Sequence, residues 1–142
     1  DSVCGHLEPD LDEEYESMLK FLRRDSDCTV LGGVRFKYQP VNSGRTLAED
    51  LKIGMGRCDA VVCTGEGTGL ATPMDKVENF RQILGDFPVI IGAGVTIDMV
   101  EACRRNSDGV IVGSWFKDNH RAEYSVNEDN VKDFMLRWNA YT

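Results

Sequence analysis

Two glycine-containing turns are the clearest chemical feature of the sequence. They comprise Gly92, Ala93, Gly94, Val95, Gly113 and Ser114. Each turn follows a short β-branched run, and one predicted helix separates them, so both should leave neighbouring parallel strands at the same edge of a sheet. Glycines leave backbone N–H groups uncovered, and a helix beginning at Thr96 would add a dipole that favours an anion. The spacing predicts a phosphate-binding site, and the alternative interpretation is that these glycines only form tight turns.

Two charged side chains are placed to act beside such a phosphate. Lys37 comes just past the end of a predicted strand, where barrel enzymes place working residues, and Glu66 projects from the loop after the next strand. A lysine there can hold or act on a substrate, and a glutamate can serve as a general acid or base. Lysines and glutamates without a chemical role are also common on surfaces. We predict Lys37 and Glu66 as candidate catalytic residues in a pocket that includes Thr64, Gly65 and Lys117.

Other kinds of site lack the residues that they need. The glycine run at residues 65–69 has Leu70 where a dinucleotide-binding fingerprint requires a further glycine, and no Gly-Lys-Ser/Thr sequence of a Walker loop occurs. His6 and His120 are not joined to any acid or cysteine at metal-ligand spacing, and both are expected to face solvent. The sequence therefore predicts no metal site and identifies no cofactor.

The elements that position these residues alternate along the chain. Strands are expected at residues 30–36, 60–63, 89–91 and 110–112. Helix starts are indicated by Asp10, by Thr46 with Glu49, by Thr72 with Pro73, by Thr96, and by Ser125 with Glu128. In the first helix, the residues predicted to face the core are Leu11, Tyr15, Met18, Leu19 and Leu22. This alternation predicts one α/β domain with a parallel sheet over residues 1–142.

Four segments carry a resemblance to a known family. They are VRFKYQP, VVCTGEGTG, VIIGAGVT and GVIVGSWFK, beginning at Val34, Val61, Val89 and Gly109. They resemble, in this order, strands 5 to 8 of the barrel in the BtpA family, which includes a factor tied to photosystem I accumulation. The similarity runs from about Val30 to Trp138. One departure is Tyr38, where the family is expected to favour histidine, and nothing in the chain resembles strands 1 to 4.

The chain is too short for the whole barrel that this resemblance implies. A (βα)8 barrel needs roughly 250 residues, whereas this chain has 142. We expect the C-terminal half of a TIM barrel of the phosphate-binding type, completed by the remaining half in the same polypeptide or by a second copy. A flavodoxin-like open parallel sheet is the alternative fold. The expected function is binding and transformation of a small phosphorylated metabolite, and the alternative is a non-enzymatic biogenesis or assembly factor that retains the barrel.

Charge and composition limit the classes of partner that the chain is expected to bind. The net charge is −8, from 24 acidic and 16 basic residues, which argues against nucleic acid and anionic membranes as main partners. No apolar run has transmembrane length. The five cysteines form no CxxC pair, and four of them lie in or beside predicted elements, where free cysteine is usually a small buried hydrophobe. We therefore expect a soluble protein of a reducing, cytoplasmic compartment.

Overall fold

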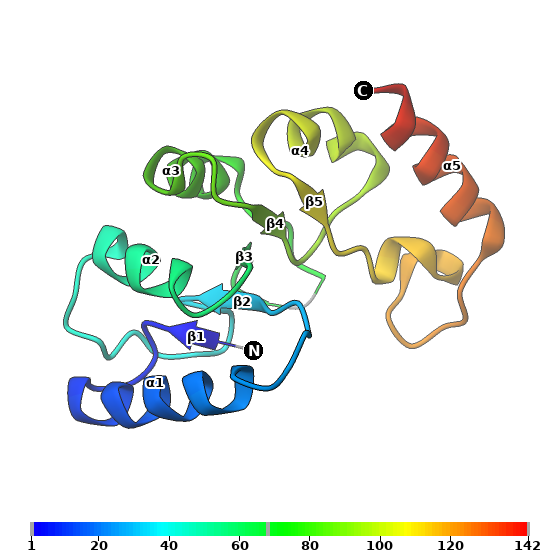
Figure 1. Cartoon of the computed structure of the whole chain (residues 1–142). Helices are drawn as coiled ribbons and strands as arrows, with labels where there is room; N and C mark the ends of the chain where they lie inside the picture. The colour runs from blue at the N-terminus through cyan, green and yellow to red at the C-terminus, as the bar shows by residue number, and fades with distance from the viewer. Residues whose placement is uncertain (1, 68, 142) are drawn as a thin grey trace.

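A computed structural model describes residues 2–67 and 69–141 and contains one five-stranded parallel sheet (Figure 1). Its strands are β1 Ser2–Cys4, β2 Leu31–Val34, β3 Ala60–Cys63, β4 Val89–Ile91 and β5 Gly109–Val110. Their order in the sheet is β1-β2-β3-β4-β5, and all neighbours pair in parallel. This order differs from the 2-1-3-4-5 order of flavodoxin-like sheets, whereas successive βα units of a barrel follow the chain in this way.

A helix follows each strand. The helices are α1 Pro9–Arg23, α2 Leu47–Met55, α3 Met74–Leu84, α4 Val100–Asn106 and α5 Glu128–Ala140. Three short 3-10 turns are η1 Ile97–Met99, η2 Ser114–Phe116 and η3 Asp118–His120. Figure 1 shows the helices in an arc outside the strands, from α1 at one end of the sheet to α5 at the other. The strands therefore have one face against helices, and the carboxyl ends of all five lie at one edge of the sheet.

The hydrophobic core fills the space between the helices and this outer face of the sheet. Alternate strand residues such as Val61, Cys63 and Ile91 point into it and are buried against helix residues such as Phe80. The register and the alternation place Leu31 and Ile111 on the opposite face, where both are exposed. Among the described residues, no second layer of helices or strands fully covers this inner face of the sheet.

Several predicted boundaries are confirmed. Strands at residues 60–63 and 89–91 have the expected limits, and Thr46 and Glu49 form the expected capping box at α2. The other two predicted strands are shorter than expected, and β1 was not predicted. The strand β1 has only three residues, 2–4, and is followed by Gly5, which has a φ of +95°. A run this short is a weak sequence signal for a strand.

Other helix starts differ from the predictions. Helix α1 begins at Pro9 rather than after Asp10, because proline is well suited to a first helical position. Helix α5 has Asn127 as its N-cap in place of Ser125, since the Asn127 side chain accepts hydrogen bonds from the N–H groups of residues 129 and 130. Thr96 makes no capping bond and precedes a 3-10 turn.

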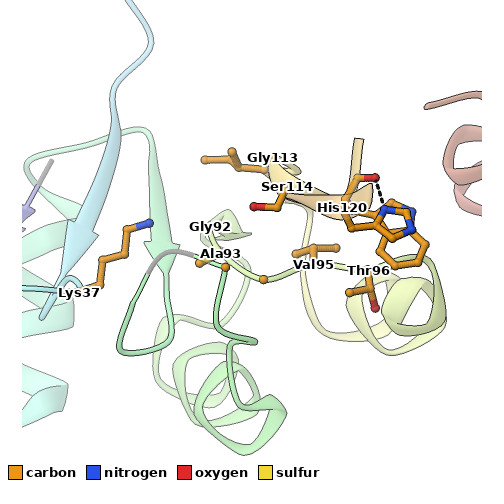
Figure 2. Close-up of a pocket in the computed structure, with 12 residues that line it drawn as sticks. Lys37, Gly92, Ala93, Val95, Thr96, Gly113, Ser114 and His120 are labelled. Atoms are coloured by element: carbon orange, nitrogen blue, oxygen red, sulfur yellow. Dashed lines mark hydrogen bonds between the residues drawn. The ribbon is translucent and has the colours of Figure 1, made fainter. Parts of the chain in front are cut away.

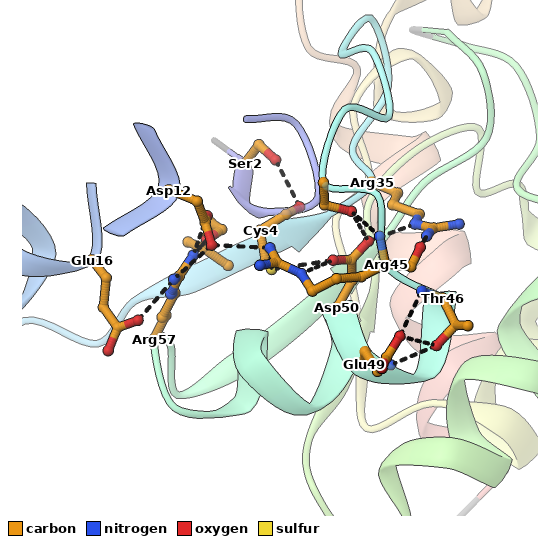
Figure 3. Close-up of polar contacts among 12 residues, drawn as sticks. Ser2, Cys4, Asp12, Glu16, Arg35, Arg45, Thr46, Glu49, Asp50 and Arg57 are labelled. Atoms are coloured by element: carbon orange, nitrogen blue, oxygen red, sulfur yellow. Dashed lines mark hydrogen bonds and ion pairs between the residues drawn. The ribbon is translucent and has the colours of Figure 1, made fainter. Parts of the chain in front are cut away.

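A buried network of charged residues holds α1 against α2 and the sheet (Figure 3). Arg57 donates to both carboxylate oxygens of Asp12 at 2.7 and 3.1 Å and to Glu16 at 2.9 Å. Arg45 joins Asp12 to Asp50, at 2.9 Å from each. Asp50 is fully buried. The inward face of α1 is therefore built from ion pairs as well as apolar packing.

This network corrects the predicted orientation of α1. Tyr15 and Leu19 are half-buried as expected, but Leu11, Met18 and Leu22 are 53%, 47% and 59% exposed. The helix turns Asp12 and Glu16 inward because the buried Arg57 needs carboxylate partners. An apolar stripe is consequently left on the outer surface of α1.

Candidate anion-binding site

A pocket of about 390 Å³ lies at the carboxyl ends of the strands (Figure 2). It is lined by Lys37, Gly69, Gly92, Ala93, Gly94, Val95, Thr96, Ile111, Gly113, Ser114, Trp115 and His120. The two predicted glycine turns thus come together, joined by a lysine that follows β2 and by two aromatic rings from the loop after β5. None of the described residues that line the pocket is acidic, in a chain with a net charge of −8.

The turn after β4 requires glycine for its backbone and for its packing. Gly94 has a φ of +64°, and an added Cβ would lie 2.2 Å from the carbonyl oxygen of Leu70. The turn is therefore pressed against the loop that follows β3. Gly113 has no such close neighbour, since an added Cβ there would meet nothing within 4 Å. Gly113 borders open space, and a larger side chain can be placed there without striking the rest of the fold.

Backbone donors are left without partners at both turns. The Gly92 N–H donates to Cys63 O at 2.8 Å. For the N–H groups of Ala93, Gly94, Val95, Gly113 and Ser114, no hydrogen bond is found within the described residues. Ala93 and Val95 are buried, where a backbone N–H is nearly always paired, whereas Gly94 and Ser114 are half-buried and Gly113 is exposed. Backbone donors grouped beside a pocket in this way are suited to hold an anion.

The helix behind the turns contributes less than the sequence predicted. A regular helix was expected to begin at Thr96, but the chain first forms η1, and α4 begins only at Val100 and has 7 residues. A short helix displaced by one turn brings a weak dipole to the pocket. The local amide groups of the turns, rather than a helix terminus, are the donors available there.

Lys37 lies on one side of the glycine turns, with its amine directed toward them in Figure 2. Its backbone N–H donates to the Thr64 hydroxyl at 3.1 Å, and its ammonium group lies 5.7 Å from the centre of the Phe36 ring. The first contact ties the backbone of Lys37, beyond the end of β2, to the residue that follows β3. Lys37 is the one lysine or arginine among the described residues that line the pocket.

Four other predicted site residues do not line the pocket. Thr64 and Gly65 are buried behind it, where the Gly65 N–H donates to the Thr72 hydroxyl at 3.1 Å. Glu66 is exposed on its loop, and Lys117 forms an isolated bridge with Val126. Thr64 and Gly65 support the loops that form the pocket, whereas no contact directs Glu66 into it.

Sequence reasoning missed Trp115 and His120. Their rings stack with centroids 3.9 Å apart and planes 4° apart, and His120 is exposed but lines the pocket. The loop between them has no helical or strand periodicity, so no sequence signal indicated this position. His6, also expected to face solvent, is half-buried against Tyr15, and burial lowers its pKa.

Three further findings bear on the chemistry of the chain. Cys63 has no nucleophilic character in the fold, because burial raises its pKa to about 12. No group of three or more His, Cys, Asp or Glu side chains able to hold a metal occurs among residues 2–67 and 69–141. In the same part of the chain, no helix has the length and apolar character needed to cross a membrane.

Comparison with known proteins gives one family. Residues 5–140 match the BtpA family. An uncharacterized protein of Thermococcus kodakarensis is 35% identical over 56% of this chain and 30% of its own length. An uncharacterized protein of Pyrococcus horikoshii is 34% identical over 78% of this chain and 41% of its own length. A third, from Methanocaldococcus jannaschii, is 26% identical over 72% and 38%. The chain thus spans less than half of these relatives, and no solved structure matches it.

Proposed function

The chain belongs to the BtpA family, and we propose that it is the C-terminal half of a (βα)8 barrel that binds a small phosphorylated metabolite at the turns after β4 and β5. The phosphate group would accept hydrogen bonds from the N–H groups of residues 93–95 and 113–114. Barrels of this kind commonly hold phosphate with the loops after strands 7 and 8, at the same end as the chemistry.

The observation that carries this proposal concerns residues 2–67 and 69–141: backbone donors without a partner there surround a pocket that none of their carboxylates lines. The chain as a whole repels anions, so binding has to come from local groups. Amide donors fixed by the Gly94 turn are already oriented, and Lys37 adds the positive charge that the amides lack. Charge-assisted hydrogen bonds of this type are about twice as strong as neutral ones.

The half-barrel part of the proposal is supported by the surfaces that the fold leaves open. Strands β1 and β5 are the two edges of the sheet, and parallel sheets in soluble proteins almost always have both faces covered. The inner face exposes Leu31 and Ile111, and α1 exposes its apolar stripe. The relatives are more than twice as long as the segments that match this chain. A second set of βα units, or a second copy, would cover these surfaces.

In this arrangement, the chain anchors the substrate. The glycine turns fix the phosphate, and Lys37 binds a second oxygen of the phosphate or a neighbouring oxygen of the metabolite. Fixing one end of a substrate in this way positions its reactive end and accounts for a large part of enzymatic rate enhancement. The groups that transfer protons would come from the other half of the barrel, at the same edge of the sheet.

Calorimetric titration with inorganic phosphate tests the proposal. Gly113→Val should remove binding while the far-UV circular dichroism is retained, because its side chain would enter open space at the turn. Lys37→Gln should weaken binding about tenfold, the loss expected for one charged hydrogen bond. Gly56→Ala and Lys52→Gln, both at exposed positions of the α2 region, are the matched controls. If the wild-type chain binds no phosphate, the non-enzymatic assembly role becomes the better interpretation.

A further inference from the structure

His120 is held in the pocket by contacts that its sequence position did not indicate. Its Nδ1 lies 2.9 Å from the carbonyl oxygen of Trp115, shown as a dashed line in Figure 2. A carbonyl oxygen only accepts, so Nδ1 carries the hydrogen and donates it. The nitrogen that can gain or lose a proton is therefore Nε2. Within the described residues, Nε2 makes no hydrogen bond.

The backbone that presents this ring is in an uncommon conformation. Asn119 and His120 have φ angles of +52° and +55°, in the left-handed region that residues other than glycine seldom adopt. The loop is tied from both sides, since His120 N–H donates to Lys117 O at 3.0 Å and Asn127 donates to the Asp118 carboxylate at 2.8 Å. Asparagine and histidine adopt this region more readily than most residues, and the contacts on both sides of the loop keep the ring at the pocket.

The ring of His120 is stacked against an aromatic side chain and leaves Nε2 available to a ligand. The indole of Trp115 stacks on the imidazole, and an aromatic face attracts a cation. Two of the neighbouring charged groups are engaged elsewhere, since Asp118 is bonded to Asn127 and Arg121 is paired with Glu123 at 2.5 Å. Lys117 contributes its backbone to the bridge with Val126. Lys37 is the other cationic residue that lines the pocket, on the far side of the glycine turns in Figure 2.

We propose that His120 contacts the bound ligand through Nε2 and that its protonation controls the affinity of the pocket for dianions. This inference rests on the proposed function. It specifies the ligand class further, as a phosphate monoester that carries two charges and is held between Lys37 and an imidazolium. Binding through Nε2–H at low pH becomes weaker when the ring loses its proton, because the donor is then replaced by a lone pair.

Sulfate is the probe that separates the protonation of His120 from a change in the charge of the ligand. Its charge does not change between about pH 5 and pH 8, so a change of affinity in this range comes from the protein, where histidine is the side chain suited to change its charge. We expect calorimetry on the full chain to give an affinity about tenfold higher at pH 5.5 than at pH 8, the difference expected for one charged hydrogen bond. His120→Gln should abolish this pH dependence. His6→Gln, at the only other histidine of the chain, should retain it.

A second measurement on the wild-type chain does not depend on how the variants fold. At pH 5.5, sulfate should shift the imidazole proton resonances of His120 and leave those of His6 unchanged. Unchanged His120 resonances with bound sulfate, or a pH dependence that persists in His120→Gln, would overturn the inference and leave the glycine site intact. Absence of sulfate binding at every pH would instead contradict the proposed function itself.

Discussion

Arg57 donates hydrogen bonds to both carboxylate oxygens of Asp12, at 2.7 and 3.1 Å, and both side chains are only 4% exposed. This pair joins α1 to the segment that precedes β3. It determines which face of α1 meets the sheet, and hence where β1 and the loop after it lie. The orientation of the helix at one edge of the sheet therefore depends on a buried ion pair.

Asp12→Asn should lower the free energy of unfolding by about 3 kcal/mol, because it leaves the buried Arg57 guanidinium short of negative charge. Urea denaturation followed by circular dichroism measures this change. Asp10→Asn is the matched control in the first turn of the same helix, where the side chain is exposed and the expected change is within about 0.5 kcal/mol. Equal stabilities of the two variants would contradict the role assigned to the pair.

Acidification should destabilise the fold through Asp12 and Asp50. Burial opposes their ionisation, but hydrogen bonds from Arg57 and Arg45 to Asp12, and from Arg45, Arg35 and Ser43 to Asp50, outweigh it, so both pKa values lie below the ordinary one. A lowered pKa stabilises the fold above the ordinary aspartate pKa of about 3.9, and this stabilisation is lost as pH falls through the folded pKa. The free energy of unfolding should fall steeply below about pH 4, and less steeply in Asp12→Asn. A fold that becomes more stable on acidification would contradict this assignment.

Gly94 and Gly85 offer a matched test of the turn after β4. Their φ angles are +64° and +60°, but an added Cβ strikes the Leu70 carbonyl only at Gly94 and meets nothing within 4 Å at Gly85. Both φ angles are ones that residues with a side chain rarely adopt, so alanine strains the backbone at either position. Gly94→Ala should cost more in thermal or urea unfolding and should also weaken phosphate binding. Identical losses, with affinity unchanged, would show that the contact with Leu70 does not shape the site.

The sequence predicted the glycine turns and the two central strands because their signals are local. A β-branched run that ends in glycine specifies a buried strand and a turn, and Thr46 with Glu49 specifies a helix start. The orientation of α1 was not predictable in this way. Its apolar and acidic residues both recur at helical spacing, and the choice between the two faces is made by Arg57, which is distant in sequence.

His120 was missed for a related reason. It reaches the pocket because the loop after β5 folds back onto residues 125–130, where Lys117 bridges Val126 and the Asn130 side chain donates to Lys117 O at 3.0 Å. One contact is a backbone bridge and the other a side-chain-to-backbone hydrogen bond, and the residues that make them have no regular spacing. Glu66 shows the opposite case, since its position after a strand indicated a site but its side chain is exposed outside the pocket.

The isolated chain should associate in solution. The apolar stripe of Leu11, Met18 and Leu22 and the uncovered inner face of the sheet would cost several kcal/mol if left in water, at about 25 cal/mol per Å². Size-exclusion chromatography with light scattering should give a mass above that of one chain. Leu22→Lys should shift the distribution toward smaller species. A soluble, cooperatively folding monomer would contradict the half-barrel assignment.

The most direct test of the central claim is the position of an anion bound to the protein. Crystals soaked in sulfate or in a sugar phosphate should show the anion within hydrogen-bonding distance of the N–H groups of Ala93, Gly94, Val95, Gly113 and Ser114, with Lys37 beside it. Density for the anion only at other positions, with both turns empty, would contradict the proposed site.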